Sequence, residues 1–366
     1  MSRRVTLADV SRKTGLSQAT VSMILSRRPD VSFAEETVRL VRATAEELGY
    51  TAARRRGALF ARRTVMVVCP FIRNYYYSTV VQALQSEAAG MECNVLVYTT
   101  YGNAAEEARL LRVMAESDVG GVIFAMMPQS RPLVRRIARQ LPMVIMADRE
   151  GESAADFVEL HNREAGALAA RHLARLGHRR IICISTPLSQ AFPVRVRRFE
   201  GLRDAWAELC PEGKVSLFTS FASHAQARDN ILLERHLGRK ITEAVLEEAR
   251  EPFTAIVAIN DMMAYGALDA LAAAGLSVPG DCSVCGLDND FPSDLVGVSL
   301  TSVEHSMAQN AREAFRLLYR KMAGESEATE VAVRRHIRPE LVPRASTGAP
   351  CPEGAPRHKS GKPLGR

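Results

Sequence analysis

Short apolar runs alternate with amphipathic stretches over residues 64–347. The apolar runs read TVMVVCP, CNVLVY, VGGVIFAM, MVIMA, RIICIS, TAIVAI and CSVCGL. Between them, residues 78–90, 106–117 and 163–176 carry apolar side chains at helical spacing. Buried strands that alternate with helices indicate parallel sheets with helices on both faces. The length of this body predicts two doubly wound α/β lobes, and such sheets bind ligands at the carboxyl ends of their strands.

The first fifty residues have a different pattern, which predicts three short helices with a tight turn between the first two. Thr6 can cap a first helix, and Asp9 in its first turn suits the positive helix start. Gly15 stands where the turn needs a positive φ. Ser17 can then cap a second helix over residues 18–25.

A capping box at residues 32–35 opens the third helix, and Gly49 ends it. The apolar faces of the second and third helices consist of Val21, Ile24, Leu25, Val38, Val41, Ala45 and Leu48. So small a bundle has a thin core and a long polar surface. The arrangement predicts an all-α helix-turn-helix head at residues 1–50, of the kind that contacts DNA.

The charge distribution supports a nucleic-acid partner for this head. Residues 1–63 hold 13 Lys and Arg against 6 Asp and Glu, whereas residues 64–347 hold 31 against 34. The last 19 residues hold 4 against 1, so the net charge of +7 lies at the two ends of the chain. A basic head on a nearly neutral body is typical of nucleic-acid binders.

These residues together resemble the lactose-repressor (LacI/GalR) family of transcriptional regulators. The head matches the family pattern T-L-x-D-V-x…G-x-S-x-x-T-V-S…L…V-S-x-x-T…V…A…E-L-G-Y. Near the other end, LTSVEHSM and RPELVPRAST match L-T-T-V-x-x-x-M and x-P-E-L-V-x-R-x-S-T. The resemblance covers residues 5–347. It implies a periplasmic-binding-protein-like core in which two lobes enclose an effector.

The resemblance makes the helix over residues 18–25 the recognition helix, placed in the major groove. Gln18 can contact adenine in a bidentate manner, Ala19 can pack on a thymine methyl, and Met23 stands where the family often has Arg. The head residues expected to contact DNA are Thr6, Ser17, Gln18, Ala19, Thr20, Ser22 and Met23.

Residues 51–63 correspond to the hinge of the family, which folds on operator DNA. Leu59 matches the leucine that wedges into the minor groove, and Arg54 and Arg55 are expected to contact phosphates. Ala52–Ala53 replaces the usual Pro-Asn pair, so the sequence leaves open whether this hinge folds only on DNA.

Matches to local motifs of the family also imply a set of ligand-binding residues in the cleft between the lobes. Asp148, Arg198, Asn260 and Asp288 lie at four separate strand–helix junctions, and their convergence would form a site for a small polar ligand. Arg198 can form forked hydrogen bonds to vicinal hydroxyls or a carboxylate. The complete expected set is Asn74, Tyr76, Tyr77, Asp148, Arg149, Arg198, Phe221, Asn260 and Asp288.

Some of these positions have a second interpretation. Tyr76 and Tyr77 can form a stacking wall for the ligand or serve as core or interface aromatics. Asp261 precedes a helix and is interpreted as its N-cap, outside the site. Cys282-x-x-Cys285 is interpreted as buried packing in a strand, since no second Cys pair accompanies it to form a metal site. His178 is interpreted as structural.

The chain is expected to cross between the lobes near residues 160, 291 and 325. This gives an N-lobe of residues 64–160 plus 292–325 and a C-lobe of residues 161–291 plus 326–347. The basic tail over residues 348–366 is expected to be disordered and lacks a leucine heptad. A homodimer is therefore expected, because a palindromic operator is read by a two-fold symmetric protein.

Three classes of function compete for this sequence. A solute-binding protein of a transport system predicts a secretion signal and no basic head, which is the reverse of what the chain has. An enzyme needs a catalytic constellation, and no G-x-S-x-G, P-loop or H-E-x-x-H motif occurs. The sequence favours a cytoplasmic DNA-binding regulator, usually a repressor. Its expected partners are double-stranded operator DNA and a small carbohydrate-like effector, with no cofactor and no membrane.

Overall fold

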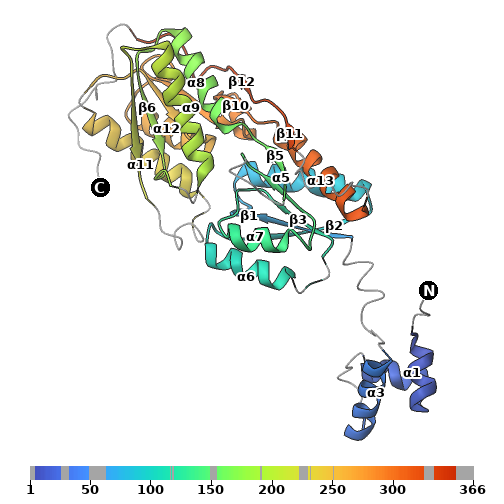
Figure 1. The fold of residues 1–366 in the computed structure, drawn as a ribbon. Helices are drawn as coiled ribbons and strands as arrows, with labels where there is room; N and C mark the ends of the chain where they lie inside the picture. The colour runs from blue at the N-terminus through green and yellow to red at the C-terminus, as the bar shows by residue number, and fades with distance from the viewer. Residues whose placement is uncertain are drawn as a thin grey trace, which may run out of the picture. The chain divides into compact units, whose positions relative to one another are not determined.

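The computed structural model divides the chain into two compact units, Met1–Thr64 and Val65–Arg366. It describes residues 5–25, 33–48, 63–115, 117, 119–148, 155–189, 192–221, 230, 232–249, 251–324 and 334–351. Figure 1 shows the helical head and the α/β core.

The head consists of α1 (Leu7–Thr14), α2 (Gln18–Leu25) and α3 (Glu35–Glu47). The Thr6 amide donates to the Asp9 carboxylate at 2.8 Å, and Gly15 ends α1 with a φ of 70°. Ser17 Oγ accepts from the Thr20 amide at 3.0 Å, which confirms the predicted cap of α2. Helix α3 begins two residues later than the predicted box requires, and Ser32 and Gly49 lie outside the described residues. The small core of the head is formed by Val10, Val21, Ile24, Val41 and Ala45.

The core contains two six-stranded sheets (Figure 1). The N-lobe sheet has the order β11-β5-β4-β3-β1-β2, and the C-lobe sheet has the order β12-β10-β9-β8-β6-β7. The N-lobe strands are β1 (Thr64–Cys69), β2 (Asn94–Thr99), β3 (Gly121–Phe124), β4 (Met143–Met146), β5 (Asp156–Glu159) and β11 (Arg334–His336). The C-lobe strands are β6 (Arg180–Ser185), β7 (Lys214–Thr219), β8 (Ala255–Ala258), β9 (Ser283–Asp288), β10 (Thr301–Glu304) and β12 (Glu340–Val342).

Helices cover the sheets of both lobes. The N-lobe carries α5 (Tyr75–Gly90), α6 (Ala104–Ala115), α7 (Arg131–Ile137) and α13 (Met307–Ala323). The C-lobe carries α8 (Asn162–Leu176), α9 (Pro193–Leu209), α11 (Leu233–Glu248), α12 (Asp261–Ala273) and the 3-10 turn η1 (Phe291–Asp294). Figure 1 shows α13 beside α5 although more than 200 residues separate them, and the two helices are in contact. Among the described helices, none is both long and apolar enough to cross a membrane.

The two lobes are wound in the same way. In each, the first strand (β1 or β6) lies between the second and third strands of that lobe. The order reverses there, so the carboxyl ends of the strands on either side diverge and leave a crevice. The doubly wound parallel architecture predicted from the apolar runs is confirmed. The antiparallel strand β12 is the exception, and it pairs with β10.

Two of the three predicted lobe crossings lie elsewhere in the structure. Strand β10 pairs with β9 and therefore belongs to the C-lobe, so the chain crosses after residue 304 and not near 291. Strand β11 pairs with β5 in the N-lobe, so the last crossing follows residue 336 and not 325. Three- and four-residue strands show too little periodicity in the sequence to be assigned to a sheet. The crossing near residue 160 agrees with the structure, between β5 and α8.

The predicted tail begins too early. The Gly348 carbonyl accepts from His178 Nε2 at 3.0 Å, and the Gly348 amide donates to Ser283 Oγ at 3.1 Å. His178 is fully buried, and Thr254 holds its other ring nitrogen at 2.7 Å, which supports its structural interpretation. Gly348 is thus bound to the C-lobe by polar contacts that composition alone does not reveal, while residues 352–366 lie outside the description.

Candidate functional site

A cleft lies where the two switch points face each other. Its walls come from the loops that follow β1, β3, β6 and β8, with about 860 Å³ of empty space that includes open solvent. Six of the predicted ligand-binding residues line it, namely Asn74, Tyr76, Tyr77, Arg198, Asn260 and Asp288.

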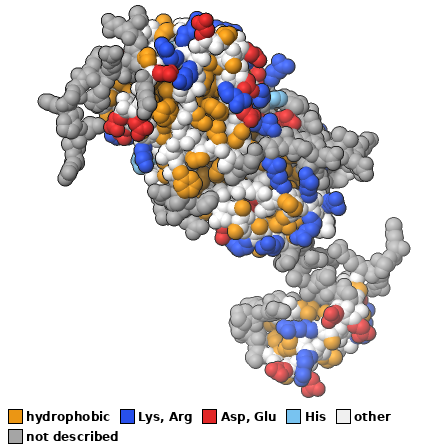
Figure 2. Space-filling model, turned by 60° about the vertical axis from the view of Figure 1, so that its left-hand side comes forward, with side chains coloured by type: hydrophobic (Ala, Val, Ile, Leu, Met, Phe, Trp, Pro, Cys, Tyr) orange, Lys and Arg blue, Asp and Glu red, His pale blue; other side chains and the backbone are white. Residues whose placement is uncertain are grey.

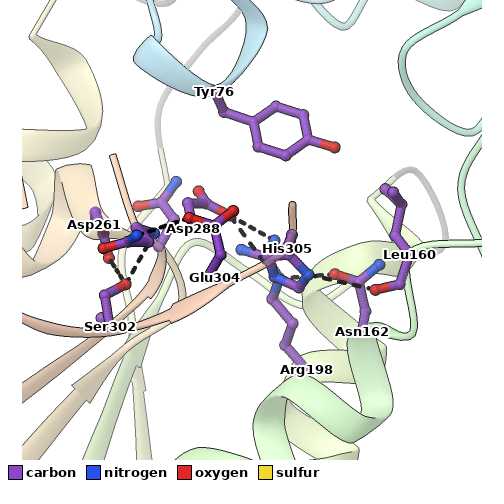
Figure 3. Close-up of polar contacts among 12 residues, drawn as sticks. Tyr76, Leu160, Asn162, Arg198, Asp261, Asp288, Ser302, Glu304 and His305 are labelled. Carbon is purple, nitrogen blue, oxygen red and sulfur yellow. Dashed lines mark hydrogen bonds and ion pairs between the residues drawn. The ribbon is translucent and has the colours of Figure 1, made fainter. Parts of the chain in front are cut away.

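Arg198 is the centre of the polar network on the C-lobe side of the cleft (Figure 3). It is 5% exposed, and its Nη2 donates to Asp288 Oδ1 at 2.6 Å. Its Nε donates to Asn162 Oδ1 at 2.9 Å and its Nη1 to the Ile259 carbonyl at 2.8 Å. With a further contact to His305, the protein holds four of the five N–H donors among the described residues. At most one is left for a ligand.

His305 is neutral in this network. Because Arg198 donates to its Nε2 at 3.1 Å, the ring proton lies on Nδ1, which donates to the Leu160 carbonyl at 3.3 Å. Burial, followed by the charge of Arg198, holds the pKa of His305 well below its ordinary value. This contact connects β5 of the N-lobe with the end of β10, beside the crossing into α8.

Asp288 ends β9 with a φ of 139°, which is unfavourable backbone for a non-glycine residue. The pKa of Asp288 is raised to about 7, because the effect of burial exceeds the opposing effect of the ion pair with Arg198. Burial lowers the pKa of Arg198, but the charge of Asp288 and the hydrogen bond to it have the larger effect, so the pKa of Arg198 is raised. Only Oδ1 of Asp288 bonds within the described network, so Oδ2 can accept a hydrogen bond from a ligand at the cleft surface.

The N-cap of α12 is Asn260, not Asp261 as predicted. Asn260 Oδ1 accepts from the Met263 amide at 3.0 Å while its side chain also lines the cleft. Asp261 is fully buried and accepts from the hydroxyls of Ser302 and Ser293 and from the Asp290 amide. It therefore holds the loop after β9, because tertiary partners and not helix position determine its contacts.

Asp148 and Phe221 do not line this cleft. The Asp148 carboxylate accepts from the amides of Leu160 and Asn162 at 3.1 and 2.9 Å, which holds the chain where it enters α8. Phe221 is 75% exposed beyond the end of β7. Arg149 lies outside the described residues. The two tyrosines line the cleft and also pack on the N-lobe core, with ring centroids 5.0 Å apart.

Sequence reasoning missed several polar residues of the site. Asn162 and His305 support Arg198, whereas Arg195 and Glu234 line the cleft themselves. Arg195 could have been found, because it lies three residues before Arg198 on the same face of a helix. Glu234 had no local signal, because only the tertiary structure brings the start of α11 to the cleft.

The surroundings of Asp290 strongly raise the pKa of its carboxyl group. It is 2% exposed, and neither of its oxygens has a hydrogen-bond partner among the described residues. Burial, together with Asp288 and Asp261, raises its pKa to about 9 from an ordinary value of 3.8. Folding thus binds a proton between these two pH values. The stability contributed is complete below about pH 4 and is lost as the pH rises towards 9.

We expect Asp290→Asn to make the core less sensitive to pH over this window. The stability lost between pH 5 and pH 8 should shrink by on the order of 1 kcal/mol or more. Urea unfolding at both pH values, followed by fluorescence of the single Trp206, measures this effect. Asp294→Asn is the matched control, because that side chain is 83% exposed. Equal pH dependence in the Asp290 variant and the parent protein would show that Asp290 is ionised when folded.

The head presents the predicted DNA-reading residues on its surface. Gln18, Ala19 and Ser22 are exposed, while Val21 and Ile24 of the same helix are buried. Thr6 and Ser17 are exposed caps, Thr20 bonds with Ser17, and Met23 is half-buried. Arg54, Arg55 and Leu59 lie outside the described residues.

The cysteines agree with the packing interpretation. Cys282 and Cys285 are fully buried in two different apolar clusters, and burial raises the pKa of both thiols. All seven cysteines are free. Within the described residues, no group of three or more His, Cys, Asp or Glu side chains could hold a metal ion.

The fold and site define a two-lobed periplasmic-binding-protein-like core joined to a helix-turn-helix head. A family model of the periplasmic binding protein-like domain matches residues 170–347. An uncharacterized HTH-type transcriptional regulator of Streptomyces limosus is 30% identical over 358 residues, covering 95% of this chain and 96% of the relative. The HTH-type transcriptional regulator DegA of Bacillus subtilis is 27% identical over 350 residues, covering 94% and 98%.

Solved structures agree with these relatives. The transcriptional regulator CelR in complex with cellobiose has a TM-score of 0.65 and 25% identity, and the match covers 94% of this chain and all of that one. A LacI-family regulator from Silicibacter pomeroyi has a TM-score of 0.68 and 24% identity, covering 94% and 99%, which supports the fold. The chain belongs to the LacI family of transcriptional regulators. Its relatives are regulators and not enzymes.

Proposed function

We propose that this chain is a cytoplasmic repressor whose operator affinity is controlled by a sugar-like ligand in the cleft. The observation that carries the proposal is the surface of α2, where Gln18, Ala19 and Ser22 are exposed over a buried Val21 and Ile24. A helix start of this kind can enter the major groove. The cellobiose bound by the similar regulator CelR supports a carbohydrate as the ligand class.

The ligand acts by shifting a conformational equilibrium between arrangements of the two lobes. Hydrogen bonds between His305 and Leu160 and between Asn74 and Glu234 connect the lobes at the cleft. A ligand that binds one arrangement more tightly changes DNA affinity by that difference alone. Couplings of about 1–3 kcal/mol, or about 5–150-fold, are typical.

The repressor acts as a homodimer, since a near-palindromic operator is read by two heads. Hydrophobic side chains gather on the visible face of the core in Figure 2. Apart from that view, three large hydrophobic side chains in the segment after β9 are strongly exposed, namely Phe291 (70%), Leu295 (45%) and Val296 (100%). Exposed apolar groups of this kind support a subunit contact.

The first experiment selects bound sequences from random duplex DNA with the purified full-length chain at near-physiological salt. One enriched near-palindrome supports a dimeric operator reader. Salt-sensitive binding without an enriched site contradicts sequence-specific reading, because contacts to phosphates alone carry no sequence information.

Gln18→Ala is then expected to weaken binding to the selected site by about 1–3 kcal/mol and to relax the sequence preference at one base pair. Affinity for random DNA should change little. Gln85→Ala, an exposed substitution on α5 of the core, is the matched control. Titrations of both variants against selected and random duplexes measure the effect. An equal loss on both duplexes would assign Gln18 to the phosphate backbone.

A further inference from the structure

Glu234 occupies a central position that no sequence motif marks. Its Oε2 accepts from Asn74 Nδ2 at 3.0 Å and from Asn260 Nδ2 at 2.9 Å. Its Oε1 accepts from Arg195 Nη2 at 2.6 Å. Asn74 belongs to the N-lobe and the other partners to the C-lobe. The carboxylate thus holds both walls of the cleft.

Glu234 also borders a second cavity that adjoins the cleft. The two share Phe71, Asn74 and Glu234, and the second is further lined by Tyr101, Leu233 and Met262 among others. A ligand that fills either cavity therefore meets this carboxylate.

The charges around the cleft are balanced in pairs. Among the described residues that line it, the cations are Arg195 and Arg198, and each is bonded to a carboxylate at 2.6 Å. The pairs are largely withdrawn from solvent, with side-chain exposures of 17% and 19% for Arg195 and Glu234 and 6% and 5% for Arg198 and Asp288. A ligand anion would meet two arginines whose charge is already balanced by a bonded, largely buried carboxylate, so neither arginine offers it much net attraction.

The surroundings oppose an anion further. Asp261 and Asp290 lie buried next to Asp288 and offer no positive charge to a bound anion. Arg73 lines the second cavity but is exposed, where solvent screens its charge. By contrast, a hydroxyl can donate to Glu234 or to Asp288 Oδ2 without disturbing either pair.

We propose that Glu234 makes this cleft select uncharged, hydroxyl-rich ligands over their phosphorylated or carboxylated counterparts. The inference rests on the proposed function, because it names the ligand class of the same cleft. Glu234 contributes in two ways. It accepts hydroxyl hydrogen bonds, and it neutralises Arg195, which would otherwise attract anions.

The test compares matched sugar pairs on the full-length protein by isothermal titration calorimetry. The probes are ribose and ribose 5-phosphate, glucose and glucose 6-phosphate, and cellobiose and cellobionate. We expect at least one neutral sugar to bind and its anionic partner to bind about tenfold more weakly or worse. An anion that binds as tightly as its neutral partner overturns the proposal, as does a panel in which no neutral sugar binds. The DNA selection does not depend on this panel, so either failure leaves operator binding separately testable.

Two variants move the charge balance in opposite directions. Glu234→Gln releases Arg195 and should shift the neutral-to-anion affinity ratio towards the anion by about tenfold. Arg195→Gln leaves Glu234 uncompensated and should shift the ratio towards the neutral sugar. Glu251→Gln is the matched control, because that glutamate forms a pair with Lys214 in which both side chains are 55% exposed.

Trp206 fluorescence and thermal unfolding verify that each variant is folded. If Glu234→Gln does not fold, Arg195→Gln alone still tests the proposal through the sign of its shift. Ratios that stay unchanged in the folded variants, or that move in the same direction in both, would show that Glu234 holds the lobes together without selecting the ligand.

Discussion

Replacing Arg198 by alanine should lower the free energy of unfolding of the core by about 3–5 kcal/mol and abolish ligand binding. The guanidinium is buried and bonds to Asn162, Ile259 and Asp288. Its removal leaves the Asp288 carboxylate buried without its cation, and an uncompensated buried charge is far more costly than a missing surface contact. Urea unfolding followed by Trp206 fluorescence measures the stability, and calorimetry with the sugar panel measures binding.

Arg203→Ala is the control for this prediction. Arg203 lies on the same helix, but its side chain is 56% exposed and pairs with the adjacent Asp204. Exposed pairs of this kind contribute about 0–1 kcal/mol. Equal losses of stability in both variants would show that the Arg198–Asp288 pair does not stabilise the core, contrary to what its buried geometry indicates. DNA binding by the folded fraction is expected to persist, since the head is a separate compact unit.

Gly201→Ala should have an effect of similar size through backbone contact alone. Helices α8 and α9 cross so closely that a Cβ on Gly201 would lie 1.8 Å from the Arg163 carbonyl oxygen. At the same crossing, a Cβ on Gly166 would lie 1.9 Å from the carbonyl oxygen of Arg198 itself. The helices must therefore separate, at a cost on the order of 3 kcal/mol. Because Arg195 and Arg198 lie on α9, ligand affinity should fall as well.

Unfolding and calorimetry on Gly201→Ala test this coupling between packing and binding. Gly90→Ala is the matched control, because a Cβ there meets nothing within 4 Å. The control should be neutral or slightly more stable, since alanine favours helix. A Gly201 variant with parental ligand affinity would show that α9 tolerates the displacement without moving its arginines.

The long apolar runs were sufficient to predict the architecture. Seven runs correspond to seven of the strands, and the second helix of the head lies at residues 18–25 as predicted. The strands that were missed are short or polar, such as β7 with the sequence KVSLFT and β11 with three residues. Edge strands bury little apolar surface, so their hydrophobic pattern is weak. The two displaced lobe crossings follow from these missed strands.

The site was predicted in part for a related reason. Residues in the junctions that follow strands, such as Asn74, Asn260 and Asp288, line the cleft because the carboxyl ends of doubly wound strands meet there. Asp148 also follows a strand, but nearby backbone amides take its carboxylate. Glu234 reaches the cleft from the start of α11, and no spacing rule places it there.

The sequence by itself determined the alternation of the seven long apolar strands with helices, the basic head and four junctions rich in polar residues. These are local properties, because hydrophobic period, capping and charge act over a few residues. Only the tertiary structure decided the partner of each polar side chain. Asp148 bonds to the backbone at the start of α8, Asp261 bonds to the loop after β9, and Glu234 bonds to residues of both lobes. A buried polar group is determined by whichever donor or acceptor the fold brings within hydrogen-bonding distance, and that neighbour is usually remote in sequence.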